Sequence, residues 1–167
     1  ADFARHEIQF GYIERSVNRN TAAEKAKFEV TNHKYTDLSE TRYGAAVLND
    51  CKYGIMAKDS KLRLSLHKGG NRPDYRGDKG VHECCYSFYP HEGGFSADNV
   101  IKPAYMLNYK PLVCRGVFKE DTFVKVSGDN IFVEAVKPPE DDEKAYVLRI
   151  YEAEGAYTNT RISFADP

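Results

Sequence analysis

The chain has 167 residues, a formal net charge of -1 and an isoelectric point near 6.6. This length allows one buried core, or slightly more than one domain, and excludes a large multidomain enzyme. The near-neutral charge excludes the basic surface that binding to nucleic acid requires. No apolar run approaches the ~20 residues needed to cross a bilayer, and the first ten residues lack the order of a signal peptide. We therefore expect neither nucleic acid nor a membrane as a partner.

Apolar and polar residues alternate with a period of two along much of the chain, which predicts half-buried antiparallel strands. The first such run is residues 8–12, where Ile8, Phe10 and Tyr12 share one face. Further runs follow at residues 62–67 and 148–150. The segment Ala45 to Leu48 is apolar on both faces and predicts a central strand, with the Asn49-Asp50 pair at its end.

Helical sequence is scarce. Thr21-Ala22-Ala23-Glu24 has the spacing of a capping box and predicts one or two helical turns before Phe28, the only helix that we expect. Glycine-rich and asparagine-rich turns separate the short strands. The sequence therefore predicts an all-β fold, an antiparallel β-sandwich. The Leu-Asn-Tyr-Lys-Pro stretch interrupts the strand pattern at Asn108 to Pro111, which predicts two units, residues 1–108 and 109–167.

The stretch from Phe28 to Gly54 adds a fixed order of polar residues that periodicity alone does not demand. It reads Phe-Glu-Val, Asp-Leu-Ser-Glu, Tyr-Gly and then Leu-Asn-Asp-Cys-Lys-Tyr-Gly, at Phe28 to Val30, Asp37 to Glu40, Tyr43 to Gly44 and Leu48 to Gly54. In order and spacing it resembles the C-terminal β domain of glycoside hydrolase family 38, the α-mannosidases. Further motifs similar to those of the family flank it, at Ile8 to Thr21, at Pro73, Asp74, Asp78 and Gly80, at His82 to His91 and at Leu148 to Ala153. The resemblance covers most of the chain.

The resemblance implies that residues 1–108 are the second half of a large β-sandwich, similar to the galactose mutarotase supersandwich, and that residues 109–167 belong to a smaller terminal β domain. It also implies that the chain is a fragment, as does Ala1, which is not an initiator methionine. The family's catalytic Asp and its zinc, bound by two His and two Asp, lie in an upstream catalytic domain. We therefore expect no catalytic residue and no metal ligand in this chain, although zinc or another divalent metal would serve the parent enzyme. The first strand would lack partners upstream, so we expect homodimerisation through exposed strand edges.

The five histidines show no local spacing that would preassemble a zinc site, although a site made of distant residues stays open. Cys84 and Cys85 would point to opposite faces of a strand, a poor geometry for one disulfide. We expect four buried free thiols and a cytoplasmic protein. Asp50 is interpreted as structural, accepting main-chain hydrogens in the turn that follows it, and Tyr53 as a packed ring with an exposed hydroxyl.

Residues 68–80, Lys-Gly-Gly-Asn-Arg-Pro-Asp-Tyr-Arg-Gly-Asp-Lys-Gly, form the candidate binding loop. The loop is longer than a hairpin needs, and it alternates donors with acceptors, which suits sugar hydroxyls. The resemblance implies that this loop reaches the catalytic domain and shapes a sugar subsite, with Lys68 where arginine is usual. The candidate substrate-binding residues are Lys68, Asn71, Arg72 and Asp74. The alternative is a solvated turn with weak surface ion pairs.

The predicted function is that of a supporting β region in a retaining α-mannosidase, whose partners are the missing N-terminal catalytic domain and an α-mannoside. Alone, the chain should be inactive. The alternative is a free-standing carbohydrate-binding or interaction module. The absence of tryptophan disfavours that alternative, because stacking on sugar faces favours tryptophan.

Overall fold

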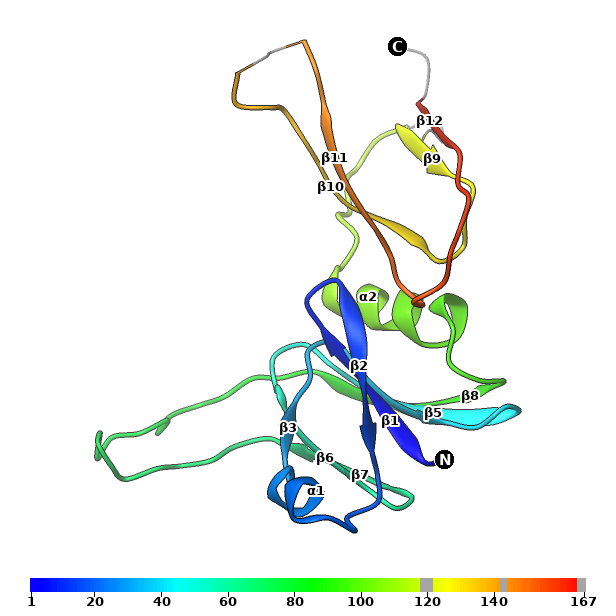
Figure 1. Ribbon diagram of the computed structural model, residues 1–167. Helices are drawn as coiled ribbons and strands as arrows, with labels where there is room; N and C mark the ends of the chain where they lie inside the picture. The colour runs from blue at the N-terminus through cyan, green and yellow to red at the C-terminus, as the bar shows by residue number, and fades with distance from the viewer. Residues whose placement is uncertain (118–121, 142–143, 165–167) are drawn as a thin grey trace.

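The computed structural model describes residues 1–117, 122–141 and 144–164. Short strands make up most of its regular secondary structure, and Figure 1 shows them in a lower body that contains β1 to β8 and an upper group that contains β9 to β12. The elements are β1 (Phe3–Ile8), β2 (Gly11–Ser16), α1 (Ala22–Ala26), β3 (Val30–Thr31), β4 (Tyr35–Ser39), β5 (Tyr43–Asn49), β6 (Gly54–Lys58), β7 (Lys61–Ser65), β8 (Tyr86–Glu92), the π-helical turn η1 (Ala97–Ile101), α2 (Lys102–Asn108), β9 (Val124–Val126), β10 (Ile131–Lys137), β11 (Val147–Glu152) and β12 (Ile162–Phe164).

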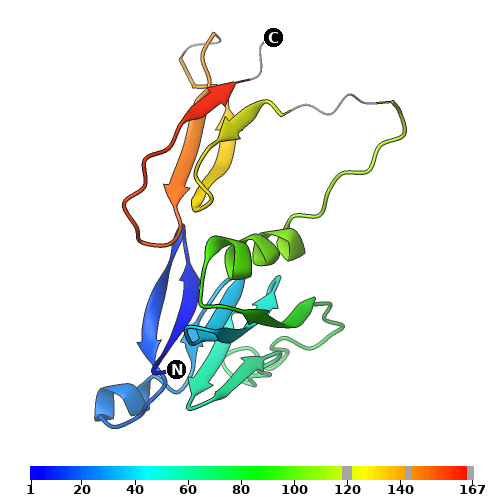
Figure 2. The same ribbon diagram turned by 90° about the vertical axis from the view of Figure 1, so that its right-hand side faces the viewer.

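The lower body is built on a five-stranded antiparallel sheet with the order β2-β1-β4-β5-β8. A second sheet, β3-β6-β7, lies on one side of it, and η1 with α2 lies on the other (Figure 1 and Figure 2). The upper group holds two antiparallel pairs, β10-β11 and β9-β12. The predicted all-β fold with antiparallel strands is therefore confirmed.

Strand β5 is central, as its sequence predicts. It pairs with β4 through Tyr35–Leu48 and with β8 through Leu48–Ser87. Ala46 and Leu48 point toward the helical side, where they join the hydrophobic core, while Ala45 and Val47 face the β6-β7 side. A strand covered on both faces needs apolar residues at successive positions, which is what this segment supplies.

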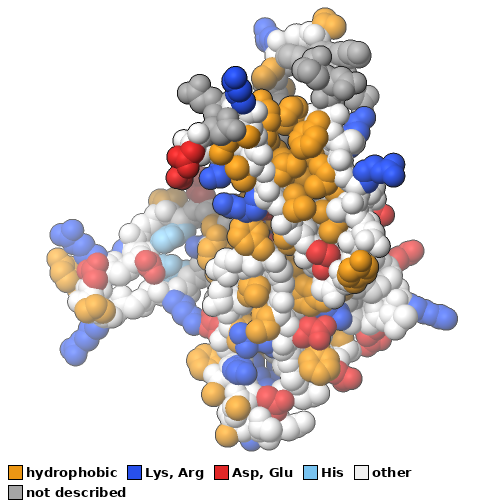
Figure 3. Space-filling model, turned by 45° about the horizontal axis from the view of Figure 1, so that its top comes forward, with side chains coloured by type: hydrophobic (Ala, Val, Ile, Leu, Met, Phe, Trp, Pro, Cys, Tyr) orange, Lys and Arg blue, Asp and Glu red, His pale blue; other side chains and the backbone are white. Residues whose placement is uncertain are grey.

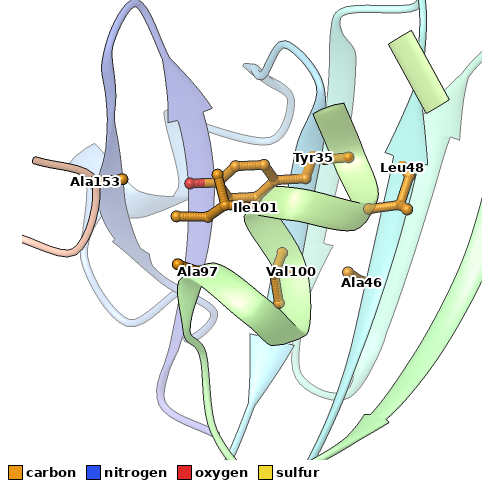
Figure 4. Packing of buried hydrophobic residues seen from close by; sticks show 8 residues of the cluster. Tyr35, Ala46, Leu48, Ala97, Val100, Ile101 and Ala153 are labelled. Atoms are coloured by element: carbon orange, nitrogen blue, oxygen red, sulfur yellow. The ribbon is translucent and has the colours of Figure 1, made fainter. Parts of the chain in front are cut away.

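The core lies between the main sheet and the helical segment. Figure 4 shows Tyr35, Ala46 and Leu48 of the sheet meeting Val100 and Ile101 of η1. The cluster is completed by Ala97, Ala104 and Ala153, and the last of these follows β11. Alanines at these positions let the helix and the sheet approach closely, so the core depends on close packing more than on large side chains.

The helix over residues 97–108 was not predicted. Its buried residues Ala97, Val100, Ile101 and Ala104 have the spacing of one helical face. Ser96 caps its start by accepting the Asn99 main-chain hydrogen at 3.1 Å. The expectation that Thr21–Glu24 marks the only helix is therefore wrong, although the capping box there is present as predicted.

The predicted strand over residues 8–12 is also wrong. Residues 9 and 10 form the turn between β1 and β2, and Phe10 has a positive φ of 56°. The signal was missed because glutamine and phenylalanine are not the residues that tight turns favour. β1 pairs on both sides, with β2 and with β4, so the first strand is not a free edge. Among the described residues, the edges of the main sheet are β2 and β8.

A column of aromatic rings links the two groups of strands. Tyr109 stacks on Tyr105 at 5.5 Å between ring centroids, Tyr105 on Phe132 at 5.2 Å, and Phe132 on Tyr151 at 5.6 Å. The Tyr105 hydroxyl also donates to Glu134 at 2.8 Å. Through Tyr105, α2 thus contacts both β10 and β11. The domain boundary expected after residue 108 stays a prediction.

Candidate functional site

The predicted loop lies in a longer excursion that we call the arm, residues 66–85, between the end of β7 and the start of β8. It projects from the lower body (Figure 1), and Figure 3 shows acidic, basic and histidine side chains along it. The arm exceeds the expected residues 68–80 because neither Leu66 and His67 nor residues 81–85 join a strand.

Local hydrogen bonds give the arm its turns. Asp74 accepts the Arg76 main-chain hydrogen at 2.8 Å through its own side chain, a common turn-forming contact. The Gly77 amide donates to the Asp74 carbonyl at 3.2 Å. A Cβ at Gly77 would collide with the carbonyl oxygen of Gly70, so the two legs of the arm can close only around glycine.

The four predicted residues occupy different parts of the arm. Lys68 lies at its base, where its ammonium group pairs with Glu29. The hydrogen bond from Lys68, and a second one from Ser65, lower the pKa of Glu29. Asn71, Arg72 and Asp74 are exposed and do not line the hollow that Lys68 lines. The structure therefore brings Lys68 together with residues outside the predicted set.

That hollow has a volume of about 350 Å³ and lies where the arm meets β6 and β7. The His67 and His82 rings lie 5.0 Å apart, and His82 Nε2 is 2.6 Å from the Asp78 carbonyl oxygen. Most of the side chains that line it are polar, and they include Glu29, Tyr53, His67, Lys68, Asp78 and His82. Carboxylate, ammonium and imidazole groups can all bond to hydroxyl groups, and a partly exposed tyrosine can contact an apolar sugar face.

Sequence reasoning missed Glu29, Tyr53, His67 and His82 as lining residues. Glu29 belongs to the Phe-Glu-Val motif, and its partner Lys68 is 39 positions away. No local spacing connects such residues, because the approach of β3, β6 and β7 brings them together.

The Asn49-Asp50 pair is structural, but the two residues divide the role that was expected of Asp50. Asn49 is fully buried, and its side chain accepts the Lys52 main-chain hydrogen at 2.8 Å in the following turn. Asp50 instead accepts the Cys85 main-chain hydrogen at 2.9 Å, which holds the C-terminal end of the arm beside the end of β5. Tyr53 is half-exposed and meets the edge of the His33 ring, with 5.2 Å between centroids.

The cysteines are free as predicted, but the expected burial is wrong. Cys51, Cys85 and Cys114 are exposed and Cys84 is half-buried. Cys84 and Cys85 precede β8 and are not part of it, so the strand geometry assumed for them does not apply. A hydrogen bond with Asp50 raises the pKa of the Cys51 thiol, which disfavours the thiolate that metal binding requires.

A buried cluster of Ser39, Asp37 and His91 holds the residue types of a hydrolase triad. Asp37 accepts from Ser39 at 2.6 Å and contacts His91 Nε2 at 3.0 Å, so the carboxylate separates the hydroxyl from the imidazole. A nucleophilic serine requires the imidazole beside its hydroxyl, as its base. Asp37 is completely buried and admits no substrate. The cluster therefore joins β4 to β8 and lacks the arrangement of a catalytic triad.

The described ranges hold neither a metal-binding cluster nor a membrane-spanning helix. Residues 1–117, 122–141 and 144–164 contain no group of three or more His, Cys, Asp or Glu side chains arranged to hold a metal ion. The side chains described thus do not fit a zinc site. In the same ranges, no helix combines the length and the apolar character that spanning a membrane requires.

Comparison with known proteins connects this geometry to a family. Residues 1–76 match the model of the glycosyl hydrolases family 38 C-terminal domain. Alpha-mannosidase G of Dictyostelium discoideum is 40% identical over 93% of this chain, the alpha-mannosidase of Saccharomyces cerevisiae 39% over 92%, and alpha-mannosidase 2C1 of Homo sapiens 38% over 98%. The chain spans only 15–16% of the length of these relatives. It belongs to glycosyl hydrolase family 38, and its residues 1–76 match the C-terminal domain of that family.

Proposed function

We propose that this chain is the C-terminal β region of an α-mannosidase, in which it supports the catalytic domain and lends the arm to the sugar subsite. The observation that carries the proposal is its identity of 38–40%, over 92–98% of its length, to proteins named alpha-mannosidases. The parent enzyme would hydrolyse α-mannosides with retention, which needs a nucleophile and an acid/base about 5 Å apart. Those residues, and zinc or another divalent metal, would lie in the N-terminal catalytic domain, so the isolated chain should be inactive.

The anchoring of the arm supports its proposed role. Glu29 holds its first leg through Lys68, and Asp50 holds its last residue through the Cys85 amide. Between these anchors, Asn71, Arg72 and Asp74 are exposed and free to meet another surface. A fixed base with exposed polar groups beyond it suits a loop that completes a site on a neighbouring domain.

The test replaces Lys68, Asn71, Arg72 and Asp74 singly with alanine in the full-length polypeptide, with kcat/KM measured on 4-nitrophenyl α-mannoside. Loss of one hydrogen bond to the sugar, worth about 1 kcal/mol, predicts a fall of about fivefold or more for at least one arm variant. Lys58→Ala, an exposed position on β6, is the matched control and should keep its activity. Unchanged kinetics in all four variants would remove the arm from the subsite.

Calorimetry separates this proposal from a free-standing carbohydrate-binding module. The isolated chain should bind mannose or mannobiose weakly or not at all, because most of the proposed site is elsewhere. A micromolar dissociation constant, equivalent to about -8 kcal/mol, would favour the binding module. The four free thiols support a reducing compartment, so we also propose a cytoplasmic location, which fractionation of cells expressing the full-length protein would test.

A further inference from the structure

An apolar groove lies between the main sheet and β7. Two adjoining hollows of about 510 and 320 Å³ make it up, and both are lined by Val47 and Phe88. Leu62 lies in the first hollow, and Leu64 and Leu66 lie in the second. Phe88 is 68% exposed, although it stands beside the central strand of the sheet. Contiguous apolar surface of this kind marks a place where another element packs.

The groove opens beside a strand edge. Among the described residues, β8 pairs only with β5, so its outer side is unpaired. The Asp50 amide donates to the Cys85 carbonyl, and the Gly93 amide donates to the Arg42 carbonyl. These two hydrogen bonds show which residues of β8 direct their main-chain groups toward β5. In an antiparallel pair every second residue directs its main-chain groups outward. In β8 these residues are Tyr86, Phe88, Pro90 and Glu92.

Pro90 limits where a further strand can pair. It has no N–H, so the outward row of donors is interrupted at its position. The Glu92 carbonyl already accepts from the Asn99 side chain at 2.9 Å. The Phe88 carbonyl accepts only a long bond, from the Ser87 hydroxyl at 3.5 Å. The part of the edge that can take a strand is therefore Tyr86 to Phe88, beside the hollow lined by Leu64 and Leu66.

We propose that an extended segment from the rest of the α-mannosidase polypeptide occupies this groove. The segment pairs with β8 at Tyr86 to Phe88, and its apolar side chains pack against Val47 and Leu64. The proposal rests on the proposed function, under which this chain is one part of a longer enzyme. The chain spans 15–16% of its relatives' length, so most of such an enzyme lies outside it. A strand added to an exposed edge gains main-chain hydrogen bonds, and alternate side chains fill the groove.

The edge is less suited to a second copy of the same chain. In a two-fold antiparallel pairing of β8 strands centred on Phe88, each Tyr86 faces Pro90 of the other copy. Every such pair lacks one main-chain donor. A segment of different sequence that pairs only with Tyr86 to Phe88 avoids this loss.

The decisive experiment places a photoreactive benzoylphenylalanine at position 88 of the full-length polypeptide, and separately at position 28 as a control. Phe28 is 62% exposed and does not line the groove. After irradiation, we expect position 88 to give an intramolecular cross-link, which mass spectrometry assigns to a peptide outside these 167 residues, at a yield at least fivefold above position 28. Equal yields at the two positions, or a cross-link to a second copy or to another protein, would overturn the proposal.

A stability measurement gives a second readout. Phe88→Asp in the full-length polypeptide places a charge against the added segment, so its melting midpoint should fall by ~3 °C or more, while that of Phe28→Asp stays close to the wild type. Equal midpoints for the two variants would count against an occupied groove. Hydrolysis of 4-nitrophenyl α-mannoside by the unsubstituted polypeptide is scored separately. A cross-link without hydrolysis would refute the proposed function alone, and hydrolysis without a cross-link would refute the groove assignment alone.

Discussion

Replacing His6 with glutamine should flatten the pH dependence of folding stability in mildly acidic solution. His6 lies on β1 with 1% of its surface exposed, and its Nδ1 is 3.0 Å from the Thr36 hydroxyl. Burial, assisted by the positive charge of Arg15, lowers its pKa from 6.5 to about 4. Between these two values the unfolded chain binds a proton that the folded chain excludes. Stability is therefore lost as the pH falls through this window.

The size of the effect follows from the shift. A pKa lowered from 6.5 to about 4 is linked to about 3 kcal/mol in total, of which about 2 kcal/mol should be lost between pH 7 and pH 5. Carboxylates also titrate at the acidic end, so the useful quantity is the difference between the variant and the wild type. Glutamine retains hydrogen-bonding groups but does not titrate.

The assay is urea unfolding of the 167-residue chain at a series of pH values from 4.5 to 7.5, followed by far-UV circular dichroism. His6→Gln should show a weaker loss of unfolding free energy on acidification than the wild type. His67→Gln provides the matched control, since it removes an exposed imidazole without touching the buried one. If His6→Gln and the wild type lose stability in parallel, burial of a neutral His6 is not a source of the acid sensitivity.

Two further substitutions test the main sheet. Gly44→Ala would place a Cβ 2.5 Å from His91 Cε1, so we expect a loss of about 2 kcal/mol in urea unfolding, whereas Gly11→Ala, with open space at its Cβ, should cost far less. Asn49→Ala removes a buried amide that donates to a main-chain carbonyl at 2.7 Å and accepts a main-chain hydrogen at 2.8 Å, which should cost about 2 to 3 kcal/mol. The exposed Asn71→Ala is its control, and equal unfolding midpoints for these two asparagine variants would contradict the assigned role of Asn49.

The sequence predicted the parts of the fold that local patterns specify. The capping box at Thr21 involves groups only three residues apart, so its spacing is sufficient evidence. The central position of β5 follows from apolar residues on both of its faces. The helical segment at residues 97–108 carried a similar signal in its apolar spacing, but it is short and contains Pro103, which lies in the first turn of α2, where proline is tolerated.

The candidate site could be predicted only in outline. The length of the segment between two predicted strands indicated a loop at residues 68–80, but nothing near Lys68 indicates that Glu29 will pair with it. That contact depends on how the three strands of the smaller sheet come together, so the spacing of residues along the sequence does not predict it. The turn at Phe10 shows the opposite case, in which the surrounding tertiary structure overrides the local preference of the residue.

The column of rings from Tyr109 to Tyr151 also has an optical consequence. The chain contains no tryptophan, so its near-UV absorption comes mainly from its twelve tyrosines. Three of them belong to the column, where the Tyr105 and Tyr151 hydroxyls lie 2.7 Å apart. Their transitions should couple and give near-UV circular dichroism that disappears when β10 and β11 separate from α2. The protein thus carries an intrinsic spectroscopic reporter, without any added label, of contact between its two groups of strands.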